Sequence, residues 1–581
     1  MVRALRAAGL VLAVAFSAPA LSATAEVRIE GISGDLLNNA RARLAIRNAA
    51  AQGEQPEYMF ERLHERAADD IRSALQPYGY YSPEITGEFA VSGEAGARRV
   101  RATYQVAPGP QTTIREVRVE IVGDGAEDPV LQQRRKELPI AAGDALRHAR
   151  YARAKDLLLS AAFARGYFDV GYRRAQIRVM REQQRADIVL ELDTGSRFLV
   201  GDIRLEQDTL DGDVLRRYLT IHEGEPFAPS ALLESQFQLM ELGYFSRVDI
   251  EPIREEAEDN RMPVRIVPEY LPSQRYSAGI GYGTDTGARI SLETDFRRIN
   301  RSGHWIESDI RVAERRSNVG ATYNIPLGNI PGERLSFSST YSDERFEDGE
   351  SSRYSVGVSL SRKPGSWKRR TYLDYSTERY NVGDLRRTTN LLMPGVSFER
   401  KEADDEIHPR NGWSVFFDVH GAAEPVLSST TFTQARVATR GVAPLPWRSR
   451  LLARFEYGAS FVDSFARLPL SERFYAGGDQ SVRGYAYQSL GERDEDGNVL
   501  GGEYMTAMSL EAEKLLWRSF GVAAFVDAGG AGNEAFPDLS RGVGLGLRYR
   551  APIGSVRVDF AHPLDDRNRG LRLHIGIGVG L

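Results

Sequence analysis

The sequence contains no cysteine, only eight histidines and no long apolar run beyond its first residues, and each shortage excludes a kind of structure. Without cysteine the chain can form neither a disulfide nor a thiolate metal or redox site. The histidines are dispersed, with no His-x-His or i, i+4 pair, so we expect no metal site. No later segment has the roughly 18 consecutive apolar residues of a transmembrane helix, so the chain would cross a membrane as a β-barrel.

The charge pattern and the short motifs do not favour an enzyme or a nucleic-acid-binding protein. The formal net charge is −5, and the arginines are spread along the chain rather than concentrated in a basic stripe. The glycines of Gly542-x-Gly544-x-Gly546 lead into a strand pattern and not into a helix, so they form no dinucleotide-binding loop. No Gly-x-Ser-x-Gly elbow is present. We therefore predict no catalytic residue, no cofactor and no nucleic-acid partner. The alternative, a hydrolase, would need a nucleophile and a base within reach of each other.

The N-terminus has the pattern of an export signal. Met1–Arg6 is short and basic, Ala7–Phe16 is apolar, and Ala23-Thr24-Ala25 has the small residues that signal peptidase reads. We predict a signal peptide over residues 1–25, with cleavage before Glu26. The alternative is a retained anchor, although the apolar run is shorter than the about 20 residues that span a bilayer.

A repeated motif divides the first half of the chain into three units. In each unit a glycine followed by two aromatic residues ends a helix-like stretch, and successive glycines are 87 and 77 residues apart. Glycine suits the left-handed residue after a helix, and aromatic residues suit the start of a strand. The motifs are Tyr78-Gly79-Tyr80-Tyr81, Arg165-Gly166-Tyr167-Phe168 and Leu242-Gly243-Tyr244-Phe245.

Each unit is predicted to be an α+β domain with the order β-α-α-β-β and a small core of its own. Apolar residues recur with a 3.6-residue period over 58–75, 145–164 and 229–242, which indicates helices. One strand pattern opens each unit and two follow its motif. Turn residues near 109 and 195 separate the units. The predicted boundaries are 26–109, 110–195 and 196–271.

From Pro272 to the C-terminus the pattern changes to strict alternation. In Tyr276–Gly283 and Leu571–Leu581, apolar residues alternate with small or polar ones. Such strands suit a barrel with lipid outside and water within. About sixteen of these segments, joined alternately by tight turns and longer acidic loops, predict a 16-stranded antiparallel transmembrane β-barrel over residues 272–581. The alternative is a soluble β-sandwich or propeller.

One stretch of this region, residues 461–502, does not fit the strand pattern. Connections of this length are usually functional or disordered, and its aromatic centre is unlike disorder. It contains Arg483 between flexible glycines, and a desolvated guanidinium needs an anionic partner. We predict that the loop folds into the lumen and that Arg483 pairs with Asp527, and with Glu511 directly or through water. The alternative is that this pair only holds a long loop in place.

These motifs together resemble the outer-membrane assembly and two-partner-secretion superfamily, in which periplasmic POTRA (polypeptide-transport-associated) domains precede a 16-stranded barrel. The resemblance covers nearly the whole mature chain. Three POTRA domains and the ending Gly578-Val579-Gly580-Leu581 are similar to its TamA (translocation and assembly module) branch. The matching motifs are Val482-Arg483-Gly484-Tyr485 on the sixth extracellular loop, Ser509-Leu510-Glu511 on the twelfth strand, Phe525-Val526-Asp527-Ala528-Gly529 on the thirteenth, and Arg541–Leu564 near the C-terminus.

The resemblance implies a function in the outer membrane of a Gram-negative bacterium, with the POTRA domains in the periplasm. It implies insertion or secretion of β-barrel and autotransporter clients, contact with outer-membrane lipid, and a TamB-like inner-membrane-anchored partner that meets the first POTRA domain. Arg483, Gly484, Tyr485, Glu511 and Asp527 would anchor the loop to the barrel. The alternatives are a two-partner-secretion transporter, a lipid-transport component or a passive porin.

The first and last strands are predicted to meet in a weak lateral seam. Alternate glycines weaken a strand because they lack side chains that pack. A seam with few cross-strand side-chain pairs can open and accept a client strand by β-augmentation. The alternative is that glycine only makes room for the inserted loop. The seam glycines are Gly279, Gly281 and Gly283 in the first strand and Gly576, Gly578 and Gly580 in the last.

Overall fold

The computed structural model of the chain describes residues 22–94, 97–283, 287–383, 385–552, 554–566 and 570–578. Most of the predicted signal peptide therefore lies outside the described residues, and residues 22–25 begin strand β1. The chain divides into two compact units, Met1–Asp202 with Ile221–Ala231 and Ile253–Pro263, and Ile203–Thr220 with Leu232–Pro252 and Val264–Leu581. No helix of the described residues is long and apolar enough to cross a bilayer.

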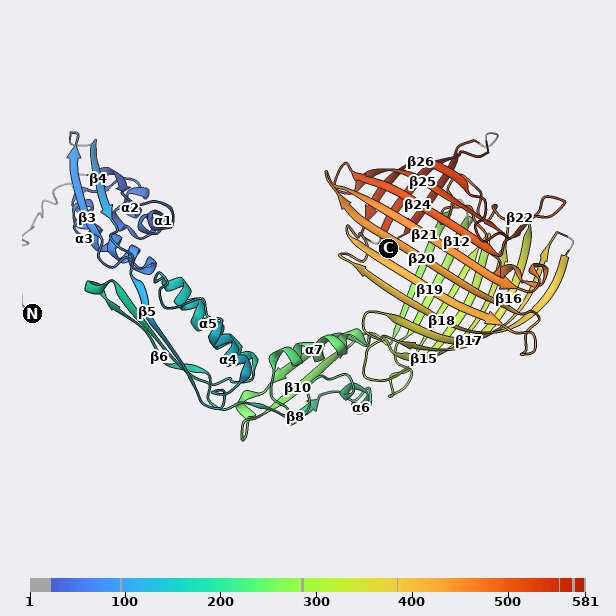
Figure 1. The fold of residues 1–581 in the computed structure, drawn as a ribbon, viewed down its shortest axis with the longest axis horizontal. Helices are drawn as coiled ribbons and strands as arrows, with labels where there is room; N and C mark the ends of the chain where they lie inside the picture. Colours follow the sequence, from blue (N-terminus) through green and yellow to red (C-terminus); the bar gives the residue numbers. More distant parts are fainter. Residues whose placement is uncertain are drawn as a thin grey trace, which may run out of the picture. The chain divides into compact units, whose positions relative to one another are not determined.

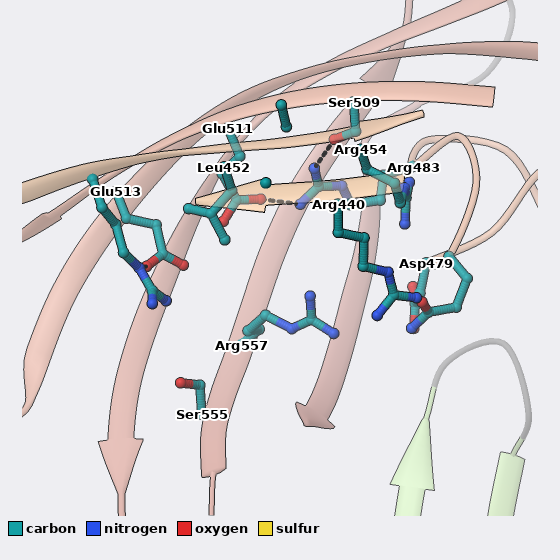
Figure 2. Close-up of a pocket in the computed structure, with 14 residues that line it drawn as sticks. Arg440, Leu452, Arg454, Asp479, Arg483, Ser509, Glu511, Glu513, Ser555 and Arg557 are labelled. Atoms are coloured by element: carbon teal, nitrogen blue, oxygen red, sulfur yellow. Dashed lines mark hydrogen bonds and ion pairs between the residues drawn. The ribbon is translucent and has the colours of Figure 1, made fainter. Parts of the chain in front are cut away.

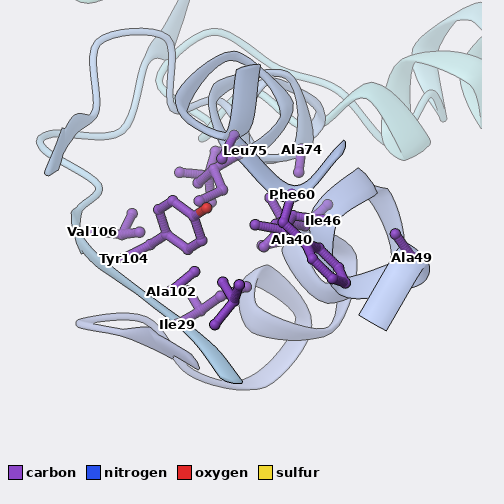
Figure 3. Close-up of a cluster of buried hydrophobic side chains, with 14 of the residues drawn as sticks. Ile29, Ala40, Ile46, Ala49, Phe60, Ala74, Leu75, Ala102, Tyr104 and Val106 are labelled. Carbon is purple, nitrogen blue, oxygen red and sulfur yellow. The ribbon is translucent and has the colours of Figure 1, made fainter. Parts of the chain in front are cut away.

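The first domain is a four-stranded sheet covered by helices. Its strand order is β2-β1-β4-β3, and β1 runs parallel to β4. The long helix α3 buries Phe60, Ala67, Ile71 and Leu75 on one face, a spacing that follows the helical period. These side chains pack on the sheet around Tyr104 (Figure 3). The elements are β1 (Ser22–Glu30), α1 (Gly34–Arg43), α2 (Ala45–Ala51), β2 (Gln55–Pro56), α3 (Glu57–Leu75), β3 (Glu84–Ser92) and β4 (Arg98–Ala107).

The second and third domains repeat the order of the first with fewer elements. Their sheets have the orders β5-β7-β6 and β8-β10-β9. The second consists of β5 (Thr113–Val122), α4 (Pro129–Lys136), α5 (His148–Ala164), β6 (Gly171–Met180) and β7 (Arg185–Asp193). The third consists of β8 (Leu199–Leu205), α6 (Gly212–Arg216), α7 (Pro229–Glu241), β9 (Phe245–Pro252) and β10 (Arg261–Tyr270).

The repeated Gly-aromatic-aromatic motif has the same backbone conformation in all three domains. Gly79, Gly166 and Gly243 have φ of +90°, +89° and +73°, a region that L side chains avoid. In the third domain the following Tyr244 donates a hydrogen bond to the carbonyl of Gly303, between the second and third barrel strands. The motif therefore ends a helix and, in this domain, also fastens the domain to a turn of the barrel.

The rest of the chain is one antiparallel sheet of sixteen strands, which confirms the predicted fold class. Figure 1 shows these strands as one curved wall. The strands are β11 (Gln274–Gly283), β12 (Gly287–Phe296), β13 (Trp305–Ala313), β14 (Arg316–Pro326), β15 (Arg334–Arg345), β16 (Gly349–Arg362), β17 (Lys368–Val382), β18 (Leu385–Ala403), β19 (Gly412–Ala422), β20 (Phe432–Leu445), β21 (Ser449–Val462), β24 (Tyr504–Leu515), β25 (Phe520–Gly532), β26 (Ser540–Ala551), β27 (Gly554–Pro563) and β28 (Arg572–Gly578).

The alternation in sequence becomes two faces of the wall. In β24 the side chains of Met508 and Leu510 are exposed on the outside, whereas Glu511 and Glu513, one residue out of step, are buried within. In β27 Phe560 is exposed, and its neighbour Asp559 is buried. Because strand side chains alternate with a period of two, every charged residue of the lumen occupies one parity of its strand.

Candidate functional site

The loop between β21 and β24, residues 463–503, folds back along the inner wall and is termed the lumen loop. It contains two single-turn helices, Phe465–Arg467 and Leu470–Glu472, and a small hairpin of β22 (Glu492–Arg493) and β23 (Val499–Gly501). Val482, Arg483 and Tyr485 at its centre are buried. A connection of this length is ordered because its centre buries apolar and charged side chains against the barrel.

Glycine allows the lumen loop to approach the wall. Gly477, Gly478 and Gly484 have φ of +101°, +99° and +101°. On the wall, a Cβ atom added at Gly542 would lie 2.0 Å from the carbonyl oxygen of Arg483. Only a residue without a side chain fits at that point, because the conflicting atom belongs to the backbone and cannot rotate away.

Arg483 is held by three carboxylates, and this group is termed the arginine clasp. Its Nε donates to Asp527 at 2.7 Å, and its two terminal nitrogens donate to Glu511 at 2.7 Å, Asp559 at 3.0 Å, Asp527 at 3.0 Å and Ser509 at 3.3 Å. All five N–H groups of the guanidinium therefore have an acceptor. The guanidinium also lies 3.4 Å from the centre of the Phe525 ring, a stacking contact.

A second arginine extends the clasp along the wall. Arg548 bridges Glu511 and Asp559, and its Nε lies 3.0 Å from Glu513. Arg450 in turn donates to Glu513 at 2.6 Å. Buried charges are costly unless they are paired, and here cations and anions alternate from β21 to β27. The network joins the lumen loop to several strands at once.

The lumen loop has a separate anchor on β16, β17 and β19. Glu472 accepts from Arg353 at 2.9 Å and lies 3.2 Å from His420. The neighbouring Ser471 bonds to Glu378, which also accepts from Ser351 at 2.7 Å. The loop is therefore tied to the wall in two places, and the two attachments have no residue in common.

A histidine links the lumen loop to the last strand. The backbone N–H of Gly484 donates to Nε2 of His574 at 3.0 Å, and Nδ1 of His574 contacts Asp479. Because Nε2 is an acceptor, it carries no proton, and Nδ1 must be the donor to the Asp479 carboxylate. The loop tip thus touches β28, one of the two strands predicted to form the seam.

The predicted seam strands, β11 and β28, are the two ends of the sixteen-stranded sheet. Within the described residues no ladder of hydrogen bonds joins them. Gly279 and Gly281 pair with Ser291 and Arg289 of β12, and Gly576 pairs with Arg557 of β27. The remaining predicted seam glycines are Gly283, which ends β11, Gly578, which ends β28 without described surroundings, and Gly580, which lies outside the described residues.

The seam glycines do not face the lumen loop where their surroundings are described. A Cβ atom added at Gly279 or Gly281 would meet the side chain of Ser291 or Arg289, and one added at Gly576 would meet Arg557. At Gly279 and Gly576 no other described atom lies within 4 Å of the added Cβ. At these three glycines the nearest described atoms therefore belong to the neighbouring strand.

The structure brings Arg483, Glu511 and Asp527 together, and Tyr485 donates to the carbonyl of Arg541 at 3.4 Å. Sequence reasoning missed Asp559 as the third acid of the clasp and His574 as the contact on the last strand. Both residues stand at lumen-facing positions of predicted strands, and this place in the alternation is the feature of the sequence that could have indicated them. No group of three or more His, Asp or Glu side chains in the described part of the chain is placed to hold a metal.

The fold and site define an outer-membrane β-barrel protein with periplasmic POTRA domains and a loop fastened inside the barrel. Family models support this class: the model described as the Omp85 superfamily domain matches residues 281–580, and two POTRA models, "POTRA domain TamA domain 1" and "Surface antigen variable number repeat", match 26–108 and 198–267. The chain belongs to the Omp85 superfamily.

Similar proteins agree with this assignment. The outer membrane protein assembly factor BamA of Nitratidesulfovibrio vulgaris is 25% identical over 437 residues, which are 70% of this chain and 54% of that protein. BamA of Neorickettsia risticii is 22% identical over 65% of this chain and 54% of that protein. The chain thus spans about half the length of these relatives. The crystal structure of BamA from Haemophilus ducreyi lacking POTRA domains 1–3 has the same fold, with a TM-score of 0.67, 18% identity and coverage of 80% of this chain and 98% of that one.

Proposed function

We propose that this protein is a TamA-type assembly factor that inserts or secretes β-barrel and autotransporter clients through the seam between β11 and β28. The observation that carries the proposal is the state of these two strands, which lack a joining ladder within the described residues. Their exposed backbone donors and acceptors can pair with the first strand of a client. Outer-membrane lipid would border the same opening.

The lumen loop supports the proposal by bracing the wall next to the seam. The arginine clasp connects the loop to β24, β25 and β27, and His574 connects it to β28. A barrel whose ends separate loses the closure that normally stabilises it. A loop bonded to strands on one side of the opening keeps that side in register while the edge is free.

The first domain supports assignment to the TamA branch. The family model for the first POTRA domain of TamA matches residues 26–108. In this domain β3 is an edge strand that pairs with β4 alone among the described residues. We propose that a TamB-like inner-membrane-anchored partner binds here. A photo-crosslinking amino acid at Thr86 of β3 is expected to capture that partner, whereas one at Arg66 of α3 is not; equal capture from both sites would contradict the assignment of the edge.

A disulfide across the seam tests the principal proposal. The chain has no cysteine, so Gly279→Cys and Gly576→Cys create a single pair. An added Cβ meets the rotatable Ser291 hydroxyl at 2.7 Å in the first case and a terminal Arg557 nitrogen at 3.8 Å in the second. Oxidation is expected to abolish insertion of an unfolded β-barrel client into proteoliposomes, and a reductant is expected to restore it.

The controls distinguish the effect of the disulfide from the effects of the two substitutions themselves. Each single cysteine variant, oxidised in the same way, should insert the client at the wild-type rate, and gel mobility should show the crosslink in the pair alone. If the fully crosslinked protein inserts its client normally, a seam that opens is not required and the proposal is wrong.

A further inference from the structure

A cavity of about 300 Å³ lies inside the barrel beside the arginine clasp. It is bounded by the loop tip at Asp479 and Arg483 and by the wall strands β20, β21, β24 and β27 (Figure 2). Several lining residues, including Arg450 and Ser555, lie near the ends of their strands at which the chain enters the barrel from the third domain. The cavity is therefore on the periplasmic half of the lumen.

The lining of this cavity has an excess of positive charge. Five arginines and three carboxylates border it. The three carboxylates are engaged, Glu511 and Glu513 by arginines and Asp479 by His574. Among the arginines, Arg450 and Arg483 are paired with carboxylates. The other three, Arg440, Arg454 and Arg557, have no carboxylate within 4.0 Å in the described part of the chain.

Arg454 is the one of the three with a buried donor that has no acceptor among the described residues. One terminal nitrogen donates to the carbonyl of Ser481 at 2.7 Å, but its Nε is buried without an acceptor among the described residues. A buried donor left without an acceptor is unfavourable, because it has lost its hydrogen bonds to water. The side chain also stands near the Arg483 cation of the clasp (Figure 2). An anion in the cavity would supply an acceptor and offset the like charges.

The chemistry of the lining selects the kind of anion. Guanidinium groups bind phosphate and carboxylate oxygens through paired N–H donors. Three arginines without a carboxylate partner among the described residues match a phosphate group better than a single carboxylate. The hydroxyl of Ser555 also borders the space. Arg557 pairs in register with Gly576 of the last strand, so this arginine is next to the seam. Because Gly576 has no side chain, none from that position covers Arg557.

We propose that this cavity binds a phosphate group, either free phosphate or the headgroup of a phospholipid, through Arg440, Arg454 and Arg557. The site goes beyond the proposed assembly function, and its occupancy does not depend on whether the seam opens. Two probes distinguish the sources: inorganic [32P]phosphate in equilibrium dialysis, and phosphatidylglycerol retained by the detergent-purified full chain in native mass spectrometry.

The test variant is the double substitution R440Q/R557Q. Neither arginine forms an ion pair with a described residue, so their loss leaves no carboxylate without its partner. The matched control is R436Q. Arg436 lies on the same strand and face as Arg440, four residues away, but it pairs with Glu456 and does not line the cavity. The control removes one positive charge from the lumen, whereas the double variant removes two, and it reports general electrostatic effects.

The expected result is that R440Q/R557Q weakens binding of one probe by about tenfold or more while R436Q leaves it unchanged. Loss of phosphate binding identifies free phosphate as the ligand. If the double variant no longer retains phosphatidylglycerol, and free phosphate does not displace this lipid from the wild type, the ligand is the lipid headgroup. The proposal is overturned if the wild type binds neither probe, or if R436Q weakens binding as much as the double variant. Heat-modifiable gel migration checks folding, and the single variant R557Q replaces the double variant if the latter does not fold.

Discussion

Replacing Arg483 by alanine removes the central cation of the arginine clasp. The residue is 5% exposed, and each of the five N–H groups of its guanidinium has an acceptor. After the substitution Arg548 still bridges Glu511 and Asp559. Asp527 would keep only the Ser509 hydroxyl and the backbone N–H of residue 483. Because removing one partner of a buried ion pair costs about 3–5 kcal/mol, we expect the free energy of unfolding to fall by about that amount.

Two further variants separate the charge from the geometry. Arg483→Lys keeps the positive charge but offers three donors that cannot match the fork, so we expect a smaller loss of about 1–3 kcal/mol. Combining Arg483→Ala with Asp527→Ala removes both members of the pair that is joined by two guanidinium hydrogen bonds. Its cost should be less than the sum of the two single costs, since neither charge is then left without its partner.

The assay is equilibrium unfolding of the reconstituted barrel in urea, followed by tryptophan fluorescence and by heat-modifiable gel migration. Single-channel conductance of the folded variants reports whether the loop has left the lumen; Arg483→Ala should conduct more than wild type. If Arg483→Ala unfolds at the wild-type urea concentration, or if the single costs add in the double variant, the clasp does not hold the loop as described.

Three further outcomes are expected. Gly542→Ala places a Cβ 2.0 Å from the carbonyl oxygen of Arg483, so it should reproduce the unfolding and conductance changes of Arg483→Ala. The control Gly441→Ala should cause neither change, because no described atom lies within 4 Å of its added Cβ. Glu472→Gln removes the acid of the second anchor and should raise conductance while the arginine clasp stays intact; unchanged conductance would show that this anchor is dispensable. Burial lowers the pKa of His64 below its ordinary 6.5, so the unfolded chain binds the proton more tightly than the folded one. The first domain should therefore lose stability as the pH falls below about 6.5. Hydrogen exchange in α3 of the full chain, compared with the His64→Phe variant, measures this loss, and a loss of equal size in that variant would exclude His64 as the cause.

The sequence by itself determined the local features of this protein. The period of two in the second half separates the lipid-facing from the lumen-facing residues, because successive strand side chains point to opposite sides whatever the strand pairs with. The apolar period before Gly79 places helix α3, and the glycine must adopt a positive φ for the chain to turn after it. The need of Arg483 for an acid is likewise a property of the residue and its apolar surroundings.

Only the tertiary structure decided which lumen-facing residues meet. The height of each side chain in the lumen depends on the stagger between neighbouring strands, which accumulates around the barrel and leaves no mark in any one segment. Asp559 therefore joins Arg483 from 76 residues away, and Glu472 meets Arg353 from 119 residues away. The same stagger gathers around one cavity three arginines that have no acidic partner in the described part of the chain. Periodicity tells which residues face inward, and register alone tells which of them are neighbours.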